Sequence, residues 1–228
     1  MVTPMSQAAS RAEIDSPKRR SILLAAGELF MTYGYGAVSM DNIARASGAS
    51  KATLYAYFES KDVLFATIIG EACRLSLQTS DFLPATVDDL KTALSNVASR
   101  MLRFLLEPGP MAIHRTVVAE SARFPELGRA FYDNGPGMFR ELFAEWLIRQ
   151  QRAGRLDVPD PEMAADQFVG LLRGSTVFTR AFLGLDPAAS EAEIGSTVAG
   201  TVSTFLRAFA VTDAAMATRA PARDTDSG

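Results

Sequence analysis

Cysteine and histidine are almost absent from this sequence of 228 residues, which contains one of each, Cys73 and His114. A single cysteine excludes an internal disulfide framework and fits a reducing compartment, so we expect a cytoplasmic protein. One histidine is too few for the histidine-based metal clusters of many enzymes. We therefore expect no metal site and no cofactor.

Long apolar segments are absent too, since the sequence has no run of 18 or more uncharged apolar residues. Its first twenty residues lack the apolar core of a secretory signal. We therefore expect no membrane span and no secretory leader. Apolar residues still make up 48% of the chain, which is enough for a sizeable core.

Catalytic motifs are also missing. The sequence has no G-x-S-x-G elbow, no Walker loop and no H-E-x-x-H motif. Asp88 and Asp89 are adjacent carboxylates, but they lie near the start of an expected helix and fit capping charge better than acid–base catalysis. We therefore expect that the protein is not an enzyme.

The net charge of −3 is unevenly divided along the chain. Residues 1–62 contain seven Lys and Arg against six Asp and Glu, which gives +1, and the remainder therefore carries −4. The acidic excess lies outside the N-terminal segment, where it interferes less with binding to a polyanion.

Residues 39–58 have the pattern of two short helices joined by a tight turn. Ser39 fits an N-cap before a first helix from about Met40 to Ala46, and Ser50 fits an N-cap before a second helix from Lys51 to Tyr57. Gly48 provides the backbone freedom that the turn between them needs. This spacing is typical of a helix-turn-helix that binds DNA.

The outer face of the second helix supports that interpretation. It combines small residues, hydroxyls, a cation and aromatic rings, which suit close approach to a polyanion: Ser50, Lys51, Ala52, Thr53, Tyr55 and Tyr57. A core helical hairpin that contains a glycine can imitate the pattern. The alternative is therefore a helical interaction or scaffold protein without specific DNA binding.

A longer set of residues makes the pattern more specific. It comprises Ala25, Ala26, Leu29, Phe30, Gly34, Tyr35, Ile43, Ala44, Gly48, Ser50, Lys51, Thr53, Leu54, Tyr55, Tyr57, Phe58, Lys61 and Leu64. Through these residues, the segment from Ser21 to Ile69 resembles the DNA-binding domain of the TetR family of bacterial transcriptional regulators. The resemblance and the chemistry of the face together predict DNA contacts by Ser39, Ser50, Lys51, Ala52, Thr53, Tyr55, Tyr57 and Lys61.

Not all basic residues in this region have a clear role. Lys18, Arg19 and Arg20 lie at the start of an expected helix that runs to Tyr33, where they fit either a solvated end or phosphate contacts. We expect Lys61 to lie beside the free amides at the start of a helix from Ser60 to about Thr79. That helix would link the DNA-binding part to the rest of the chain.

The remaining sequence predicts an all-α fold, a three-helix N-terminal DNA-binding domain followed by a larger helical domain. Further helical patterns occupy about 87–107, 111–122, 136–153, 161–184 and 190–211, with a short helix near 124–132. We expect a disordered tail over 1–16, the DNA-binding domain over 17–77, a ligand-binding and dimerisation domain over 78–211, and a second tail over 212–228.

The last two long helical patterns are rich in small residues at spacings of four. This composition fits either packing within one chain or a four-helix seam between two subunits, and the family resemblance favours the seam. The residues expected in a homodimer interface are Phe168, Gly174, Phe178, Ser196, Ala199, Gly200 and Ser203.

The middle of the chain would hold a ligand pocket if the resemblance extends that far. The expected lining is apolar except for His114: Met101, Phe104, Leu105, His114, Phe139, Phe143, Trp146, Phe168 and Leu172. Plain core packing is the alternative for most of them, and a partly exposed helix position is the alternative for His114. The segment from Val117 to Leu127 resembles a C-terminal domain type of one group of these regulators.

The sequence thus predicts a homodimeric transcriptional regulator that binds an operator in double-stranded DNA and responds to a small apolar or amphipathic effector. A repressor is the expected form, although the sequence does not separate a repressor from an activator. The two recognition helices of a dimer must lie about 34 Å apart to reach successive major grooves. An effector that prefers another spacing would shift the population away from the DNA-competent state.

Overall fold

The computed structural model describes residues 16–77, 83–84, 87–185 and 189–211. Apart from Ser16, the two expected disordered tails lie outside these residues. The named elements of the described part are all α-helices, which confirms the predicted all-α fold with an N-terminal helix-turn-helix. None of the described helices is long and apolar enough to cross a membrane.

The chain divides into two compact units. The first consists of Met1–Thr79 with Phe104–Phe139, and the second consists of Ser80–Arg103 with Arg140–Gly228. The first unit therefore combines the helix-turn-helix segment with a stretch from the middle of the chain.

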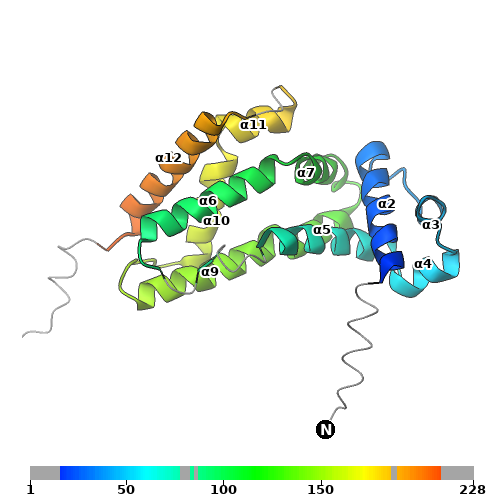
Figure 1. Cartoon of the computed structure of the whole chain (residues 1–228), viewed down its shortest axis with the longest axis horizontal. Helices are drawn as coiled ribbons and strands as arrows, with labels where there is room; N and C mark the ends of the chain where they lie inside the picture. Colours follow the sequence, from blue (N-terminus) through cyan, green and yellow to red (C-terminus); the bar gives the residue numbers. More distant parts are fainter. Residues whose placement is uncertain (1–15, 78–82, 85–86, 186–188, 212–228) are drawn as a thin grey trace, which may run out of the picture. The chain divides into compact units, whose positions relative to one another are not determined.

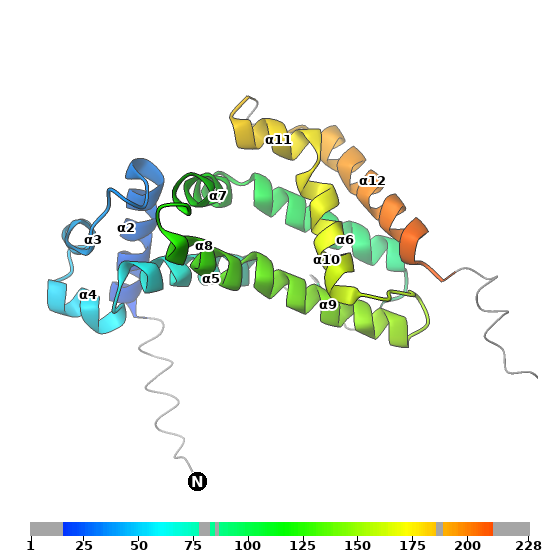
Figure 2. The same cartoon turned by 180° about the vertical axis from the view of Figure 1, so that it is seen from behind.

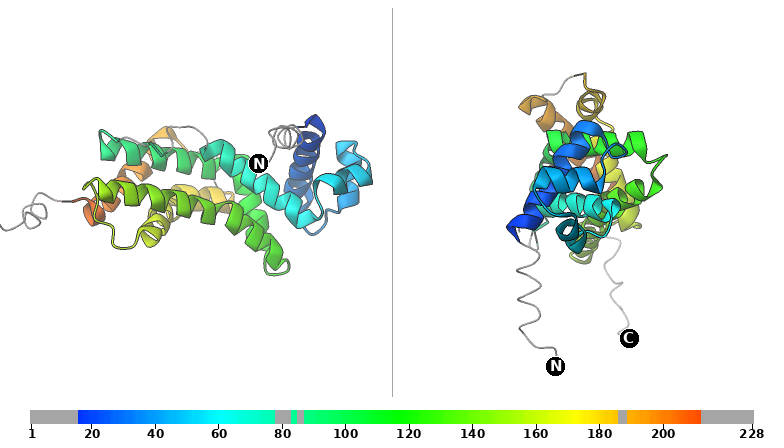
Figure 3. Two further views of the ribbon diagram at one scale, coloured as in Figure 1. Left: turned by 90° about the horizontal axis from the view of Figure 1, so that it is seen from below. Right: turned by 90° about the vertical axis from the view of Figure 1, so that its right-hand side faces the viewer.

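The described part of the first unit contains α2 (Pro17–Tyr33), α3 (Met40–Ser47), α4 (Lys51–Tyr57), α5 (Lys61–Leu77), α7 (Pro108–Glu120) and α8 (Pro125–Asn134). Helices α2, α3 and α4 gather at one end of α5 (Figure 1, Figure 3). A shared apolar core holds these helices together, and Ile22, Ile43 and Leu54 are fully buried in it. Each of α3 and α4 is too short to be stable alone, so this core fixes them.

Helices α7 and α8 contribute to the same core. Val117 and Leu127 are buried in it, and α8 packs along α5 while α7 packs against α2 (Figure 2). The sequence predicted a DNA-binding domain that ends at residue 77, and it did not predict that α7 and α8 would pack into its core.

The second unit contains α10 (Pro161–Arg173), α11 (Thr176–Leu183) and α12 (Glu191–Phe209), with most of α6 (Leu90–Leu106) and α9 (Pro136–Arg152). Aromatic rings fill its core. The ring centroid of Phe168 lies 4.9 Å from that of Phe143 and 5.1 Å from that of Phe205.

The predicted long helix over 161–184 is two helices. Helix α10 ends at Arg173, and the hydroxyl of Ser175 then caps α11 by accepting a hydrogen bond from the Phe178 amide at 3.2 Å. The apolar spacing continues across Gly174 and Ser175, so periodicity alone did not reveal the break. The expected short helix near residues 124–132 is present as α8.

Candidate nucleic-acid interface

The turn between α3 and α4 has the backbone geometry that its sequence predicts. Gly48 has a φ of 61°, in the left-handed region that favours glycine. The amides of Gly48 and Ala49 donate to the carbonyls of Arg45 and Ala44 at 3.3 and 3.0 Å. The last carbonyls of α3 are therefore satisfied, and the chain can turn sharply into α4.

Side-chain caps fix where both helices begin. The Ser39 hydroxyl accepts from the Asn42 amide at 3.2 Å, and the Asn42 side chain accepts from the Ser39 amide at 2.9 Å. The Ser50 hydroxyl accepts from the Thr53 amide at 3.0 Å and lies 2.8 Å from the Thr53 hydroxyl. Ser39, Ser50 and Thr53 therefore all have structural roles at the helix starts. Serine before a helix is a signal for such a start in a sequence.

The outer face of α4 is exposed as predicted for Lys51, Ala52 and Tyr55, while Thr53 and Tyr57 are half-buried. Lys51 extends toward α3, where its ammonium lies 2.5 Å from the Asp41 carboxylate. Both side chains of this ion pair are largely exposed, so the pair contributes little to stability.

Tyr57 and two basic residues of α2, Lys18 and Arg19, have partners within the protein. The Tyr57 hydroxyl lies 2.9 Å from the Ser16 hydroxyl. Lys18 donates to the Gly48 carbonyl at 2.5 Å, and Arg19 pairs with Glu71 at 2.5 Å. The sequence allowed either a solvated end or phosphate contacts for this basic run, and neither alternative includes these internal contacts.

Lys61 is also engaged within the protein. Its ammonium donates to the carbonyls of Tyr35 and Val38 at 2.8 and 3.0 Å and lies 4.1 Å from the centre of the Tyr35 ring. Burial lowers the pKa of Lys61, and the nearby carboxylates of Glu120 and Glu126 act in the opposite direction. The structure therefore does not group Lys61 with the exposed side chains of α4.

The residues expected at a dimer interface have two different locations. Gly174, Ser196, Ala199, Gly200 and Ser203 are exposed on the second unit, whereas Phe168 and Phe178 are buried in its core.

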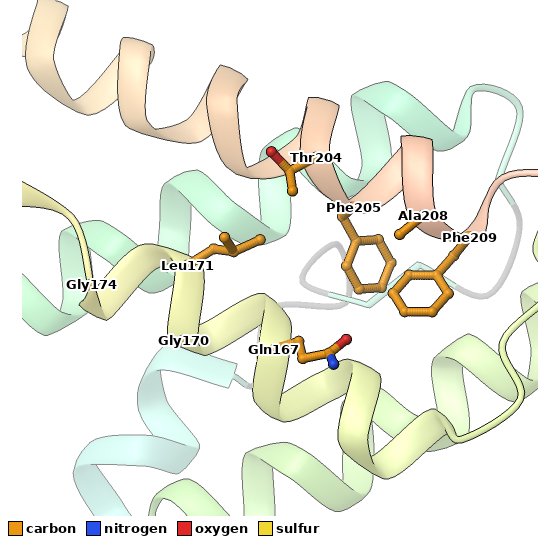
Figure 4. A pocket seen from close by; sticks show the side chains of 8 residues that line it. All are labelled: Gln167, Gly170, Leu171, Gly174, Thr204, Phe205, Ala208 and Phe209. Carbon is orange, nitrogen blue, oxygen red and sulfur yellow. The ribbon is translucent and has the colours of Figure 1, made fainter.

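A groove runs between α10 and α12 on the second unit. Figure 4 shows the residues that line it: Gln167, Gly170 and Leu171 on α10, Gly174 directly after that helix, and Thr204, Phe205, Ala208 and Phe209 on α12. Three of these lining residues, Gly170, Gly174 and Ala208, are small.

The expected ligand-lining residues are divided between the two units. Met101, Phe143, Trp146, Phe168 and Leu172 belong to the second unit, whereas Phe104, Leu105, His114 and Phe139 belong to the first. Most of them are buried, and Phe104, Leu105 and His114 are half-buried.

These residues pack against other protein groups. Trp146 is fully buried, stacks on Phe143 with ring centroids 5.7 Å apart and donates its indole N–H to the Pro84 carbonyl at 3.0 Å. His114 stacks on Phe131. The described residues contain no group of three or more His, Cys, Asp or Glu side chains that could hold a metal ion.

Two protein-family profiles match the chain. Residues 22–68 match "Bacterial regulatory proteins, tetR family", and residues 92–211 match "AefR-like transcriptional repressor, C-terminal domain". Among curated proteins, the HTH-type transcriptional activator FasR of Mycolicibacterium smegmatis (strain ATCC 700084 / mc(2)155) is 42% identical over 52 residues. That match covers 23% of this chain and spans only 24% of the curated relative.

Solved structures are similar over most of the chain. The flavonoid-responsive regulator FrrA is 36% identical, with a TM-score of 0.71, and the match covers 85% of this chain and 97% of FrrA. A Mesorhizobium loti MAFF303099 protein assigned to the TetR family is 27% identical, with a TM-score of 0.73 and the same coverage. These similar proteins are regulators and not enzymes, which confirms that expectation. Since one profile covers more than half of the chain and FrrA is similar across most of it, the chain belongs to the TetR family of bacterial transcriptional regulators, which bind DNA.

Proposed function

We propose that the protein is a cytoplasmic, homodimeric repressor that releases its operator when a small apolar or amphipathic effector binds. The observation that carries this proposal is the exposed outer face of α4. The turn at Gly48 and the side-chain caps at the starts of α3 and α4 fix the position of this face. Such a face fits the major groove of double-stranded DNA, because small residues permit close approach while hydroxyls and a cation reach phosphates and base edges.

The proposed DNA contacts divide into two kinds. Thr53 and Tyr55 are nearest to base edges, and Ala52 allows the helix to approach closely. Lys51 and Tyr57 contact phosphates, with Ser39 and Ser50 assisting through their hydroxyls. We do not include Lys61 among the proposed DNA contacts, because its ammonium already donates to two carbonyls inside the protein.

The proposed dimer interface is the outer face of α10 and α12. A second copy of the chain is the proposed occupant, since α12 exposes Ser196, Ala199, Gly200 and Ser203 along one side. A helix of 19 residues is about 28 Å long, which is sufficient for an interface of standard size when two helices from each subunit meet. Phe168 packs against Phe205 of α12 beneath this face, and Phe178 is buried on α11.

The effector proposal rests on the apolar character of the expected lining. Phe, Met and Trp side chains favour an organic ligand, and a few polar groups such as His114 or Arg115 would orient it. The flavonoid-responsive name of FrrA agrees with a ligand of this class. One part of the chain is similar to FasR, which is named as an activator. Another part matches a profile that is named for a repressor, so the direction of regulation needs its own test.

One selection experiment tests the proposal. The purified protein is mixed with a random pool of duplex DNA, and the retained fragments are sequenced. We expect an inverted repeat whose half-sites lie one helical turn or a near multiple apart. Retention without a shared sequence would favour the scaffold alternative. Recovery of single, unpaired half-sites would contradict the dimer.

Release of the selected DNA then tests the effector. Hydrophobic drugs, flavonoids and lipophilic acids are titrated while the fluorescence of Trp146 and the amount of bound DNA are followed. Release by these compounds supports the proposal. If only metal ions or nucleotides release the DNA, the effector class is wrong. Fusing a reporter gene to the selected operator then distinguishes repression from activation.

A further inference from the structure

The loop between α2 and α3 is held from both sides by opposite charges. On one side, the two carboxylate oxygens of Glu120 accept hydrogen bonds from the amides of Tyr35 and Gly36 at 2.8 and 2.5 Å. On the other side, the ammonium of Lys61 donates to the carbonyls of Tyr35 and Val38. The next residue, Ser39, is the N-cap of α3. These contacts therefore fix the backbone that leads directly into the helix-turn-helix.

The two glycines of this loop are explained by the approach of Glu120. A Cβ atom at Gly34 would lie 2.6 Å from one carboxylate oxygen of Glu120, and a Cβ atom at Gly36 would lie 2.9 Å from the other. Gly34 also has a φ of 78°, but Gly36 is not in the left-handed region, so backbone freedom does not account for it. Gly36 therefore provides space for the carboxylate.

Glu120 lies in the Val117–Leu127 segment. This segment lies within residues 92–211, which match the AefR-like profile. Other side chains of this segment hold the same loop. The Phe124 ring packs edge-on against the Tyr35 ring with centroids 5.5 Å apart, and the Lys61 ammonium lies 5.6 Å from the centre of the Phe124 ring. The end of α7 and the start of α8 are thus built into the body that presents α3 and α4 (Figure 2).

We propose that Glu120 is a positioning residue for DNA binding. It touches no proposed DNA contact, and it acts by holding the Tyr35 and Gly36 amides so that α3, and with it α4, keeps one orientation. A movement of α7 that withdraws this carboxylate would free the loop, which makes Glu120 the point where α7 acts on the DNA-binding helices. The inference rests on the proposed DNA-binding face of α4.

Glu120→Gln tests this role with a minimal change in shape. A glutamine has one acceptor oxygen and an NH2 donor, so it leaves one of the two backbone amides without an acceptor. Glu126→Gln is the matched control, because Glu126 is an exposed carboxylate of the same segment and removing it deletes the same charge. Amide hydrogen exchange is followed by NMR at a temperature where circular dichroism shows that both variants are fully folded. DNA affinity and its salt dependence are measured on operators selected with the wild-type protein.

For Glu120→Gln we expect exchange to accelerate about 10- to 100-fold at whichever of the Tyr35 and Gly36 amides loses its acceptor, the range for a lost hydrogen bond to a charged group. DNA affinity should fall about tenfold with an unchanged salt slope, while Glu126→Gln changes neither exchange nor affinity. Uniformly faster exchange across the first unit with unchanged affinity would mean that Glu120 is only structural. Equal losses of affinity in the two variants, or a changed salt slope, would also overturn the proposal. If the wild-type protein selects no DNA, the proposed function fails, and the exchange data still decide whether Glu120 holds the loop.

Discussion

Two exposed helical faces in this molecule contain small residues. They differ in the other side chains of each face. The face of α4 places Lys51 and Tyr55 beside Ala52, with hydroxyls at the start of the helix. The face of α12 runs from Gly195 to Ser203 and contains no ionisable side chain. Small residues permit close approach on both faces, so size alone does not identify the partner.

Charge and hydrogen-bonding groups make that distinction. A polyanion is bound through cations and donors that replace its counterions, and α4 has these groups. A neutral face of glycine, alanine and serine suits a second helix, because helix axes can come close without leaving charges buried and unpaired. We therefore assign DNA to the first face and a second subunit to the other.

The largest effect is expected from Gly200→Leu. A Cβ atom at Gly200 meets no other atom within 4 Å in the single chain, so the substitution should leave each subunit folded. In a tight seam it would overpack the contact, at a cost of roughly 1–3 kcal/mol. Loss of the paired half-sites should then weaken operator binding by about a hundredfold.

Sedimentation at micromolar concentration measures this effect. Gly27→Leu is the control, since a Cβ atom at Gly27 would also meet no other atom within 4 Å, and Gly27 lies on α2, outside the proposed seam. A wild-type monomer, or a Gly200→Leu variant that dimerises as well as the control, would contradict the assignment of the α12 face.

The next largest effect concerns the sequence preference of the α4 face. Thr53→Ala should relax discrimination at one base pair in each half-site by roughly 1–3 kcal/mol, because one contact to a base edge is lost. Thr53→Ser retains the hydroxyl and should keep most of the preference. Affinities for operators with single substitutions give the result, and an unchanged preference in Thr53→Ala would remove Thr53 from the base contacts.

A smaller effect is expected from the Lys51–Asp41 pair. Lys51→Ala should reduce the salt slope by about 0.9 per subunit through loss of one phosphate contact. Asp41→Asn should act in the opposite direction on affinity, since it frees the Lys51 ammonium and removes a negative charge from this face. Lys91→Ala, an exposed lysine on α6 in the other unit, is the control and should leave the slope unchanged. Titrations of affinity against salt compare the three variants.

Local signals explain why the sequence predicted the DNA-binding helices well. Ser39, Gly48 and Ser50 specify helix starts and a turn through their own backbone preferences, and the structure contains each of these features. The break at Ser175 was missed, because a serine within continuous apolar spacing does not show whether it caps a new helix.

Long-range contacts explain what the sequence did not reveal. Lys61 and Glu120 are 59 residues apart, and no periodic pattern indicates that they hold the same loop. At Gly36, only the folded positions of the Glu120 carboxylate and the Phe124 ring show what a Cβ atom would meet. The buried positions of Phe168 and Phe178 are likewise a result of packing among α9 to α12.

The last prediction is that alkaline pH weakens the first unit before it affects dimerisation through the second. Burial, followed by the nearby charges of Asp62, Glu126 and Glu120, raises the pKa of Tyr35 to about 12 from its ordinary value of 10.0. Below pH 10 the phenol is neutral in the folded and unfolded chains, and its contribution to stability is complete. As the pH rises from 10 toward 12, only the unfolded chain ionises, so this contribution is lost.

Tyr35→Phe keeps the ring and removes the ionising group, so its unfolding midpoint in urea should fall less between pH 9 and pH 11 than that of the wild type. The lowered pKa of Lys61 has the opposite effect on stability in this range, but both proteins contain Lys61 and the comparison largely removes its contribution.

The α12 face has no ionisable side chain from Gly195 to Ser203, so dimerisation should persist in mild alkali while the loop before α3 weakens. Equal alkaline losses in the two proteins would mean that Tyr35 does not set the pH dependence. Dissociation of the dimer before that loss would show that the α12 face depends on charge after all.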